Sequence, residues 1–151
     1  MKINVPRDAG VCTRCPMECR LVSSSDPWSC QVWIRWEFDD QGRRRTGTRE
    51  PEVPFGPLIT DKSHVELALR RAQAAVLNPA LPFEEFLSKS EEELKAEFAR
   101  SPQALRFSKN VVCVDLKGPE LTDLSFIDLP GPFFTLYCGM TLSNSFTIVL
   151  L

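Results

Sequence analysis

Strand-like segments stand on both sides of a helical middle section, and this order restricts what the chain can fold into. Ahead of the middle section, residues 17–22 alternate apolar and polar side chains, and residues 28–38 are dense in aromatic and β-branched ones. After it, residues 107–116 contain a nearly continuous apolar run, and residues 121–128 form a further strand-like stretch. Strands separated by helices predict an α/β protein in which a mixed β-sheet is flanked by helices.

Two helices are predicted in the middle section from their end signals and apolar spacing. Residues 62–77 follow capping side chains and end before Asn78-Pro79, where the proline disfavours continuation. Residues 90–99 begin with Ser90 and Glu93 at the spacing of a capping box. The stretch between the helices, around residues 79–86, is predicted to be irregular.

Short connections predict how the strands pair. Residues 17–22 and 28–38 are joined by a turn, and so are residues 107–116 and 121–128. Strands that follow each other closely in sequence usually lie side by side. We therefore expect two antiparallel pairs, with residues 43–57 forming a polar link to the first helix.

The charge balance argues against a nucleic-acid partner. The formal net charge of the 151 residues is −2, whereas nucleic-acid binding usually needs a clustered basic face. The one dense basic run, Arg43-Arg44-Arg45, follows Gly42 and is interpreted as a solvated turn rather than a phosphate-binding patch. The first residues contain no apolar signal segment, so we expect a cytoplasmic location.

Six cysteines raise the question of a metal or redox site, since Cys12, Cys15 and Cys19 lie close together in sequence. A structural zinc ion normally needs four thiolate or imidazole ligands in paired spacings, and His64 is the only histidine. A redox pair of Cys12 and Cys15 is disfavoured because no thioredoxin-like strand–helix context surrounds it. The cysteines are therefore expected to be small buried hydrophobic residues.

Residues 132–151 differ in kind from the rest, because no charged residue follows Asp128. Their length matches a membrane span of about 20 residues. Pro132, Gly139 and Asn144 and the absence of flanking basic anchors oppose that interpretation. We divide the chain into residues 1–131, the predicted domain, and residues 132–151, an uncharged apolar tail that becomes an aggregation hazard if it finds no partner.

Two short segments are candidates for chemistry, a loop over residues 8–16 and the sequence Asp128-Leu129-Pro130-Gly131. An aspartate at the carboxyl end of a strand can hold a hydrated magnesium ion, and a following glycine lets a backbone N–H approach a phosphate. Thr13 in the loop can offer a hydroxyl to the same ion. Each segment alone is weak evidence, because either is also an ordinary turn.

Taken together, the two segments resemble the nucleotide-sensing switches of the dynamin superfamily of large GTPases, in its Mx-like and vacuolar-sorting branch. Gly10, Thr13, Arg14 and Pro16 match the G-x-x-T-R-x-P segment of switch I. Residues 115–131 are similar to the strands that end in switch II. The two segments occur in the family's order, and the resemblance covers residues 3–131.

The resemblance implies a partial P-loop GTPase domain, with GTP as substrate and Mg²⁺ as cofactor. Thr13 would be the catalytic threonine, which contacts Mg²⁺ and positions the attacking water. Asp128 would act on Mg²⁺ through water, and Gly131 would meet the γ-phosphate. Gly10 would lie in the loop that helps to hold a monovalent cation.

The chain also departs from the family pattern. It contains neither the P-loop sequence G-x-x-x-x-G-K-[ST] nor the guanine-reading T-K-x-D. Because the P-loop cradles the phosphates, we expect a GTPase relative that is inactive by itself. Family membership implies self-association, a full-length dynamin-like partner, or a place at the periphery of membranes. The alternatives are a non-catalytic interaction fragment and a small protein with a membrane tail.

Overall fold

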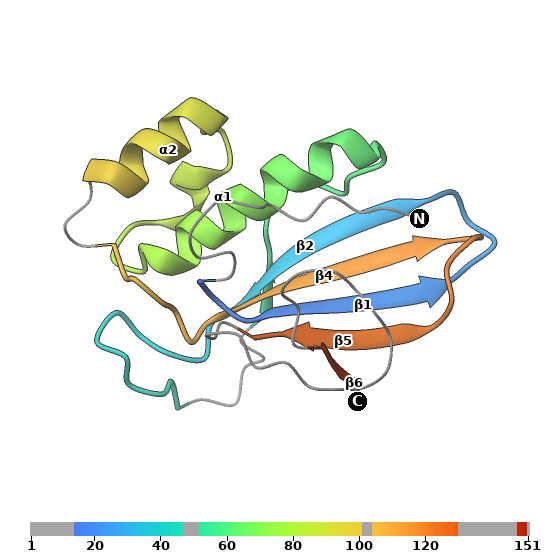
Figure 1. The fold of residues 1–151 in the computed structure, drawn as a ribbon, viewed down its shortest axis with the longest axis horizontal. Helices are drawn as coiled ribbons and strands as arrows, with labels where there is room; N and C mark the ends of the chain where they lie inside the picture. Colours follow the sequence, from blue (N-terminus) through green and yellow to red (C-terminus); the bar gives the residue numbers. More distant parts are fainter. Residues whose placement is uncertain (1–13, 47–51, 101–103, 130–147, 151) are drawn as a thin grey trace.

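The computed structural model describes residues 14–46, 52–100, 104–129 and 148–150, which form one six-stranded mixed sheet and its helices (Figure 1). The strands are β1 (Met17–Ser23), β2 (Ser29–Arg35), β3 (Glu52–Pro54), β4 (Val111–Gly118), β5 (Leu124–Asp128) and β6 (Ile148–Leu150). The helical elements are η1 (Lys62–His64), α1 (Val65–Leu77), η2 (Phe83–Phe86) and α2 (Glu91–Arg100). The order of strands in the sheet is β3-β2-β4-β1-β5-β6.

Both predicted antiparallel pairs are wrong, because a distant strand lies between the members of each. β4 stands between β1 and β2, parallel to the former and antiparallel to the latter. β1 in turn stands between β4 and β5. The physical reason is the apolar run that opens β4, from Val111 to Val114, which is buried on both faces. A strand without a polar face is stable only in the interior of a sheet.

The predicted elements are confirmed, with changes at their ends. The strand predicted over residues 28–38 ends at Arg35, and the one predicted from residue 107 begins only at Val111. The polar link over residues 43–57 contains the short strand β3, and the stretch predicted as irregular contains η2. The fold class, an α/β protein with a mixed sheet, is as expected from the sequence.

The side chains that were predicted to cap the helices form hydrogen bonds with backbone N–H groups at the helix starts. The backbone N–H of Ser63 donates to Asp61 Oδ1 over 2.9 Å, which caps η1. At α2, the N–H of Ser90 donates to Glu93 Oε2 over 2.7 Å and the N–H of Glu93 donates to Ser90 Oγ over 3.2 Å. This reciprocal pair is a capping box.

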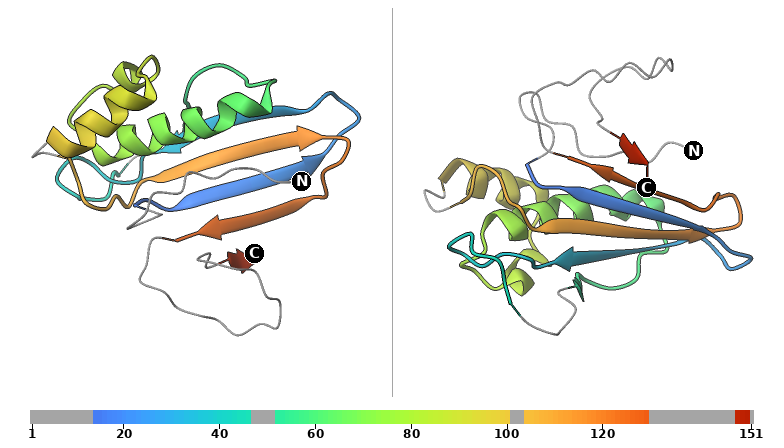
Figure 2. Two further views of the ribbon diagram at one scale, coloured as in Figure 1. Left: turned by 45° about the horizontal axis from the view of Figure 1, so that its top comes forward. Right: turned by 90° about the horizontal axis from the view of Figure 1, so that it is seen from below.

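The two faces of the sheet have different surroundings. α1 packs on β2 and β4, and the helices lie over this half of one face (Figure 2). On that face Val32 and Val114, which are cross-strand partners, are almost completely buried. Continuing along the same row, Cys19 on β1 and Phe126 on β5 are only partly buried. The opposite face carries charged side chains and is described below.

The C-terminal segment contributes an edge strand to the sheet. β6 pairs antiparallel with β5, and Ile148 is the partner of Asp128. The remainder of the predicted tail, residues 130–147 and 151, lies outside the described residues. Among the described residues, no helix combines the length and apolar character needed to cross a bilayer.

A buried polar pair, Ser108 and Asn110, fastens the start of β4 to two other segments. The Asn110 side chain accepts from the N–H of Phe38 over 2.9 Å and donates to the Phe38 carbonyl over 3.3 Å. The N–H of Ser108 donates to the Arg14 carbonyl over 2.9 Å. Asn110 is 2% exposed, so these bonds form away from water, where a lost partner is costly.

We predict that Asn110→Ala lowers the free energy of unfolding by about 2–3 kcal/mol, because two backbone groups of Phe38 lose their partner. Denaturant titration followed by circular dichroism measures the change. Gln41→Ala, an exposed position in the turn that follows Phe38, is the control, with an expected change within about 0.5 kcal/mol. Equal effects of the two substitutions would show that the Asn110 bonds do not stabilise the fold.

Candidate functional site

Asp128 is the one predicted site residue that the structure describes. It is the last residue of β5, is 5% exposed, and is the cross-strand partner of Met17, the first residue of β1. Gly10, Thr13 and Gly131 lie outside the described residues. The sheet therefore brings Asp128 and the start of β1 together at one end.

Asp128 lies near two thiols. Burial, and secondarily the negative charge of Asp128, raises the pKa of the Cys15 thiol to about 12. Burial raises the pKa of Cys19 to about 12 as well, again with a contribution from Asp128. Both thiols therefore keep their protons at neutral pH, which makes them poor nucleophiles and poor metal ligands.

The expectation that the cysteines are buried hydrophobic residues is confirmed for those described. Cys15, Cys30 and Cys113 are completely buried, Cys19 is half-buried, and all four are free thiols. Cys12, the other member of the redox pair that the sequence disfavours, lies outside the described residues.

The open face of the sheet carries a cluster of ion pairs that the sequence reasoning missed. We call it the ionic cluster, and its charged members come from four strands: Glu18 and Arg20 on β1, Arg35 on β2, Glu52 on β3 and Asp115 on β4. Their side chains are 13–29% exposed, which places them between a surface network and a buried one. Three carboxylates and two guanidiniums give the cluster a formal charge of −1.

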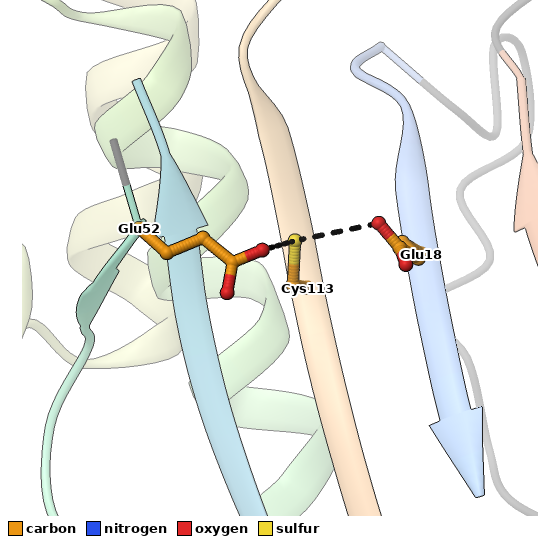
Figure 3. Close-up of side chains that lie close together, drawn as sticks. All are labelled: Glu18, Glu52 and Cys113. Atoms are coloured by element: carbon orange, nitrogen blue, oxygen red, sulfur yellow. Dashed lines mark hydrogen bonds between the residues drawn. The ribbon is translucent and has the colours of Figure 1, made fainter. Parts of the chain in front are cut away.

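Arg35 joins two carboxylates from different strands. Its Nη2 lies 2.6 Å from Glu18 Oε2 and 2.5 Å from Glu52 Oε1, and its Nε donates to the same Glu52 oxygen over 3.0 Å. Because β4 runs between β1 and β2, this side chain bridges over β4 to reach Glu18. Cys113 on β4 lies beneath, between the two glutamates (Figure 3).

Arg20 provides the second bridge. Its Nε donates to Asp115 Oδ1 over 2.5 Å, and its terminal nitrogens lie 3.3–3.4 Å from the Glu52 carboxylate. Glu52 is therefore shared by both arginines. Burial alone would raise the pKa of Glu52, but the hydrogen bonds from Arg35 and Arg20 outweigh it and hold the pKa below its ordinary value.

Two carboxylates and a thiol at one place also raise the question of a metal ion. Ligand atoms of Glu18, Glu52 and Cys113 lie within 4.8 Å of one another. However, the Arg35 guanidinium already forms ion pairs with both carboxylates. Burial raises the pKa of the Cys113 thiol to about 12, although the charge of Arg35 opposes this rise. This arrangement fits an internal cation, the arginine, better than a metal that requires a thiolate.

Part of the ionic cluster had a signal in the sequence. Glu18 and Arg20 occupy alternate positions of a predicted strand, which indicates one polar face. Glu52 had no such signal, because it lay in the predicted link. The position of β4 between β1 and β2 decides which charged side chains of the cluster form ion pairs. That position is a property of the tertiary fold.

Curated proteins with similar sequences are GTP-binding proteins. The chain is 26% identical over 129 residues to an interferon-induced GTP-binding protein Mx2 of Sus scrofa, and 27% identical over 129 residues to one of Canis lupus familiaris. Each match covers 85% of this chain but 12% of the relative. No protein-family model matches the chain. The chain is therefore distantly similar to dynamin-like GTP-binding proteins over a small part of their length.

We predict that the ionic cluster makes stability sensitive to acid through Glu52. Its pKa in the folded chain lies below the ordinary 4.5, so its contribution is complete above that pH and is lost as the pH falls through the folded value. The unfolding free energy of the native chain should therefore fall more steeply below pH 4.5 than that of Glu52→Gln. Denaturant titrations at several pH values test this. Glu120→Gln, at an exposed turn position, should follow the native chain.

We predict that Arg35→Met lowers the free energy of unfolding by about 2 kcal/mol, because Glu18 and Glu52 then face each other without their shared cation. The matched control is Arg43→Met, which removes the exposed Arg43–Asp39 pair and should lower the free energy of unfolding far less, because water screens that pair. Thermal and chemical unfolding measure both variants. If the two variants are equally stable, the ionic cluster does not hold the sheet together.

Proposed function

We propose that this chain is part of a dynamin-type GTP-binding domain whose nucleotide-sensing segments are the chain entering β1 and the chain leaving β5. The observation that carries the proposal is the antiparallel pairing of Met17 with Asp128. Thr13 precedes Met17 by four residues, and Gly131 follows Asp128 by three. The distant similarity to GTP-binding proteins over 129 residues supports the same assignment.

Asp128 has the chemistry of a magnesium site. A carboxylate oxygen is the kind of ligand that Mg²⁺ prefers, and the ion usually retains several of its waters. Asp128 stands at the carboxyl end of a sheet strand, where ligands of open α/β sheets collect. The nearby Cys15 thiol does not compete for the ion, because it stays protonated at neutral pH.

In this proposal the remaining residues have distinct roles. Thr13 is a further ligand and the catalytic residue that orients the attacking water, while Gly131 lets a backbone N–H approach the γ-phosphate. Gly10 belongs to the loop that holds a monovalent cation. When bound, Mg²⁺ neutralises charge on the phosphate oxygens. The reaction is in-line hydrolysis of GTP, in which positioning and electrostatics supply the catalysis.

We further propose that the chain alone does not hydrolyse GTP. None of its 151 residues forms a G-x-x-x-x-G-K-[ST] segment, whose backbone N–H groups and lysine supply much of the phosphate binding. Asp128 and Thr13 act on a nucleotide that other groups hold in place. Without those groups, the two segments are expected to bind GTP weakly.

Titration of the purified chain with a fluorescent GTP analogue, with and without Mg²⁺, tests the proposal. We expect no saturation at high micromolar nucleotide and GTP turnover at background, unchanged by Thr13→Ala. Saturable, guanine-selective binding that needs Mg²⁺ would contradict the inactivity of the chain.

A matched pair of variants tests the assignment of the site in case binding is seen. Asp128→Asn should then abolish the Mg²⁺ dependence, whereas Asp123→Asn should not. Asp123 lies just before β5, where its carboxylate accepts a hydrogen bond of 2.6 Å from the N–H of Ser23. Binding that tolerates Asp128→Asn, or that does not distinguish GTP from ATP, would contradict the proposed roles.

A further inference from the structure

The arginine run that follows β2 belongs to a short turn on the surface. Arg43, Arg44 and Arg45 are all exposed, which agrees with the solvated turn expected from the sequence. The N–H of Arg45 donates to the Glu37 carbonyl over 2.8 Å. Arg44 forms an isolated antiparallel β-bridge with Phe38. Backbone hydrogen bonds therefore hold the run against the segment that leaves β2.

Asn110 brings a further basic residue to this turn. Its side chain binds the backbone N–H and carbonyl of Phe38, and Lys109 precedes it directly in the chain. The Lys109 ammonium lies 5.2 Å from the centroid of the Phe38 ring. Since Lys109 and Phe38 are far apart in sequence, no local pattern indicates that this lysine lies beside the arginine run.

Aromatic rings hold two of these cations in place. Arg45 Cζ lies 5.7 Å from the centroid of the Trp36 ring, and Lys109 lies over Phe38 at a similar distance. A cation within about 6 Å of a ring centroid is attracted to the face of the ring. A side chain held in this way loses less conformational entropy when it binds a partner. We call the group of Trp36, Phe38, Arg44, Arg45 and Lys109 the basic patch.

The carboxylates of the chain do not neutralise the basic patch. Among the described residues, no carboxylate forms an ion pair with Arg44, Arg45 or Lys109. Arg43, by contrast, pairs with Asp39 over 2.9 Å. The segments outside the described ranges contain three basic residues and two acidic ones, Lys2, Arg7 and Arg49 against Asp8 and Glu50. These segments add positive charge overall, so a complementary anion has to come from outside the 151 residues.

The surroundings of the basic patch favour a short acidic peptide segment over a long polyanion. Glu37 and Asp40 lie in the same turn, and the formal net charge of the chain is −2. A nucleic acid that extends beyond the patch therefore meets negative charge. Phe107, two residues before Lys109, is 56% exposed and offers an apolar contact. Arginine and aromatic side chains together are typical of surfaces that bind proteins.

We propose that the basic patch binds an acidic segment of a partner protein, whose carboxylates pair with Arg44, Arg45 and Lys109. A guanidinium can donate two parallel hydrogen bonds to one carboxylate, which fixes the orientation of the segment. Because the three cations are exposed, each ion pair contributes little, and the complex is weak and sensitive to salt. This inference uses surface charges alone and is independent of the proposed nucleotide site.

Fluorescence anisotropy of a dye-labelled synthetic peptide, made of glutamates around one leucine, tests the proposal when the full chain is titrated into it at low salt. We expect saturable binding that weakens as salt is added and that is lost when glutamines replace the glutamates. Arg44→Gln combined with Lys109→Gln should weaken binding roughly tenfold, because two exposed ion pairs are lost. The control Arg43→Gln removes a charge from the same run, but one already paired with Asp39, and should weaken binding less than about twofold.

Three results would overturn the proposal: no saturable binding of the glutamate peptide, equal effects of the double variant and Arg43→Gln, or tighter binding of a single-stranded oligonucleotide of the same charge. A second test needs no variant. Backbone amide resonances of residues 36–45 and 109 should shift when the peptide is added to the native chain, whereas those of α1 should not. Shifts that leave residues 36–45 and 109 unchanged would also contradict the proposal.

Discussion

The structure depends on the burial of β4 on both of its faces. The residues from Val111 to Val114 leave no polar side of the strand to face water, so β4 must have a neighbour on each edge and cover on each face. β1 and β2 supply the neighbours, and α1 supplies the cover on one side. Because β1 and β2 are thereby separated, their short connection passes beyond the end of β4 instead of forming a hairpin.

The ionic cluster is a consequence of the same arrangement. Once β4 lies between β1 and β2, Arg35 can reach Glu18 only by passing over Cys113. The cluster covers the second face of β4 with charged side chains that form ion pairs with one another. Glu52 links β3 to β1 and β2 through its ion pairs with Arg20 and Arg35. Removing the charges of such a network from water is costly, so the network as a whole adds little net stability, whereas loss of one partner leaves a buried charge unpaired and destabilises the fold.

Sequence reasoning succeeded where local signals decide the structure and failed where distant segments meet. The capping box of Ser90 and Glu93 and the stop at Asn78 gave the helices nearly to the residue, because neighbours in sequence make those contacts. Asp128 was expected at the end of a strand and is found there. Glu52, assigned to a loop, was missed as a member of the ionic cluster because its partners are contributed by β1 and β2.

The sequence by itself determined the α/β class, the positions of the helices, the burial of the cysteines that the structure describes and the resemblance on which a nucleotide site can be proposed. Tertiary structure alone decided the order of the strands, the pairing of Asp128 with Met17 at the start of β1, and the edge of the sheet at which β6 lies. The reason is that hydrophobic periodicity reports which face of a strand is buried but not which strand lies beside it. The order of the strands follows from the burial of β4. Contacts between residues that are far apart in the sequence produce this burial.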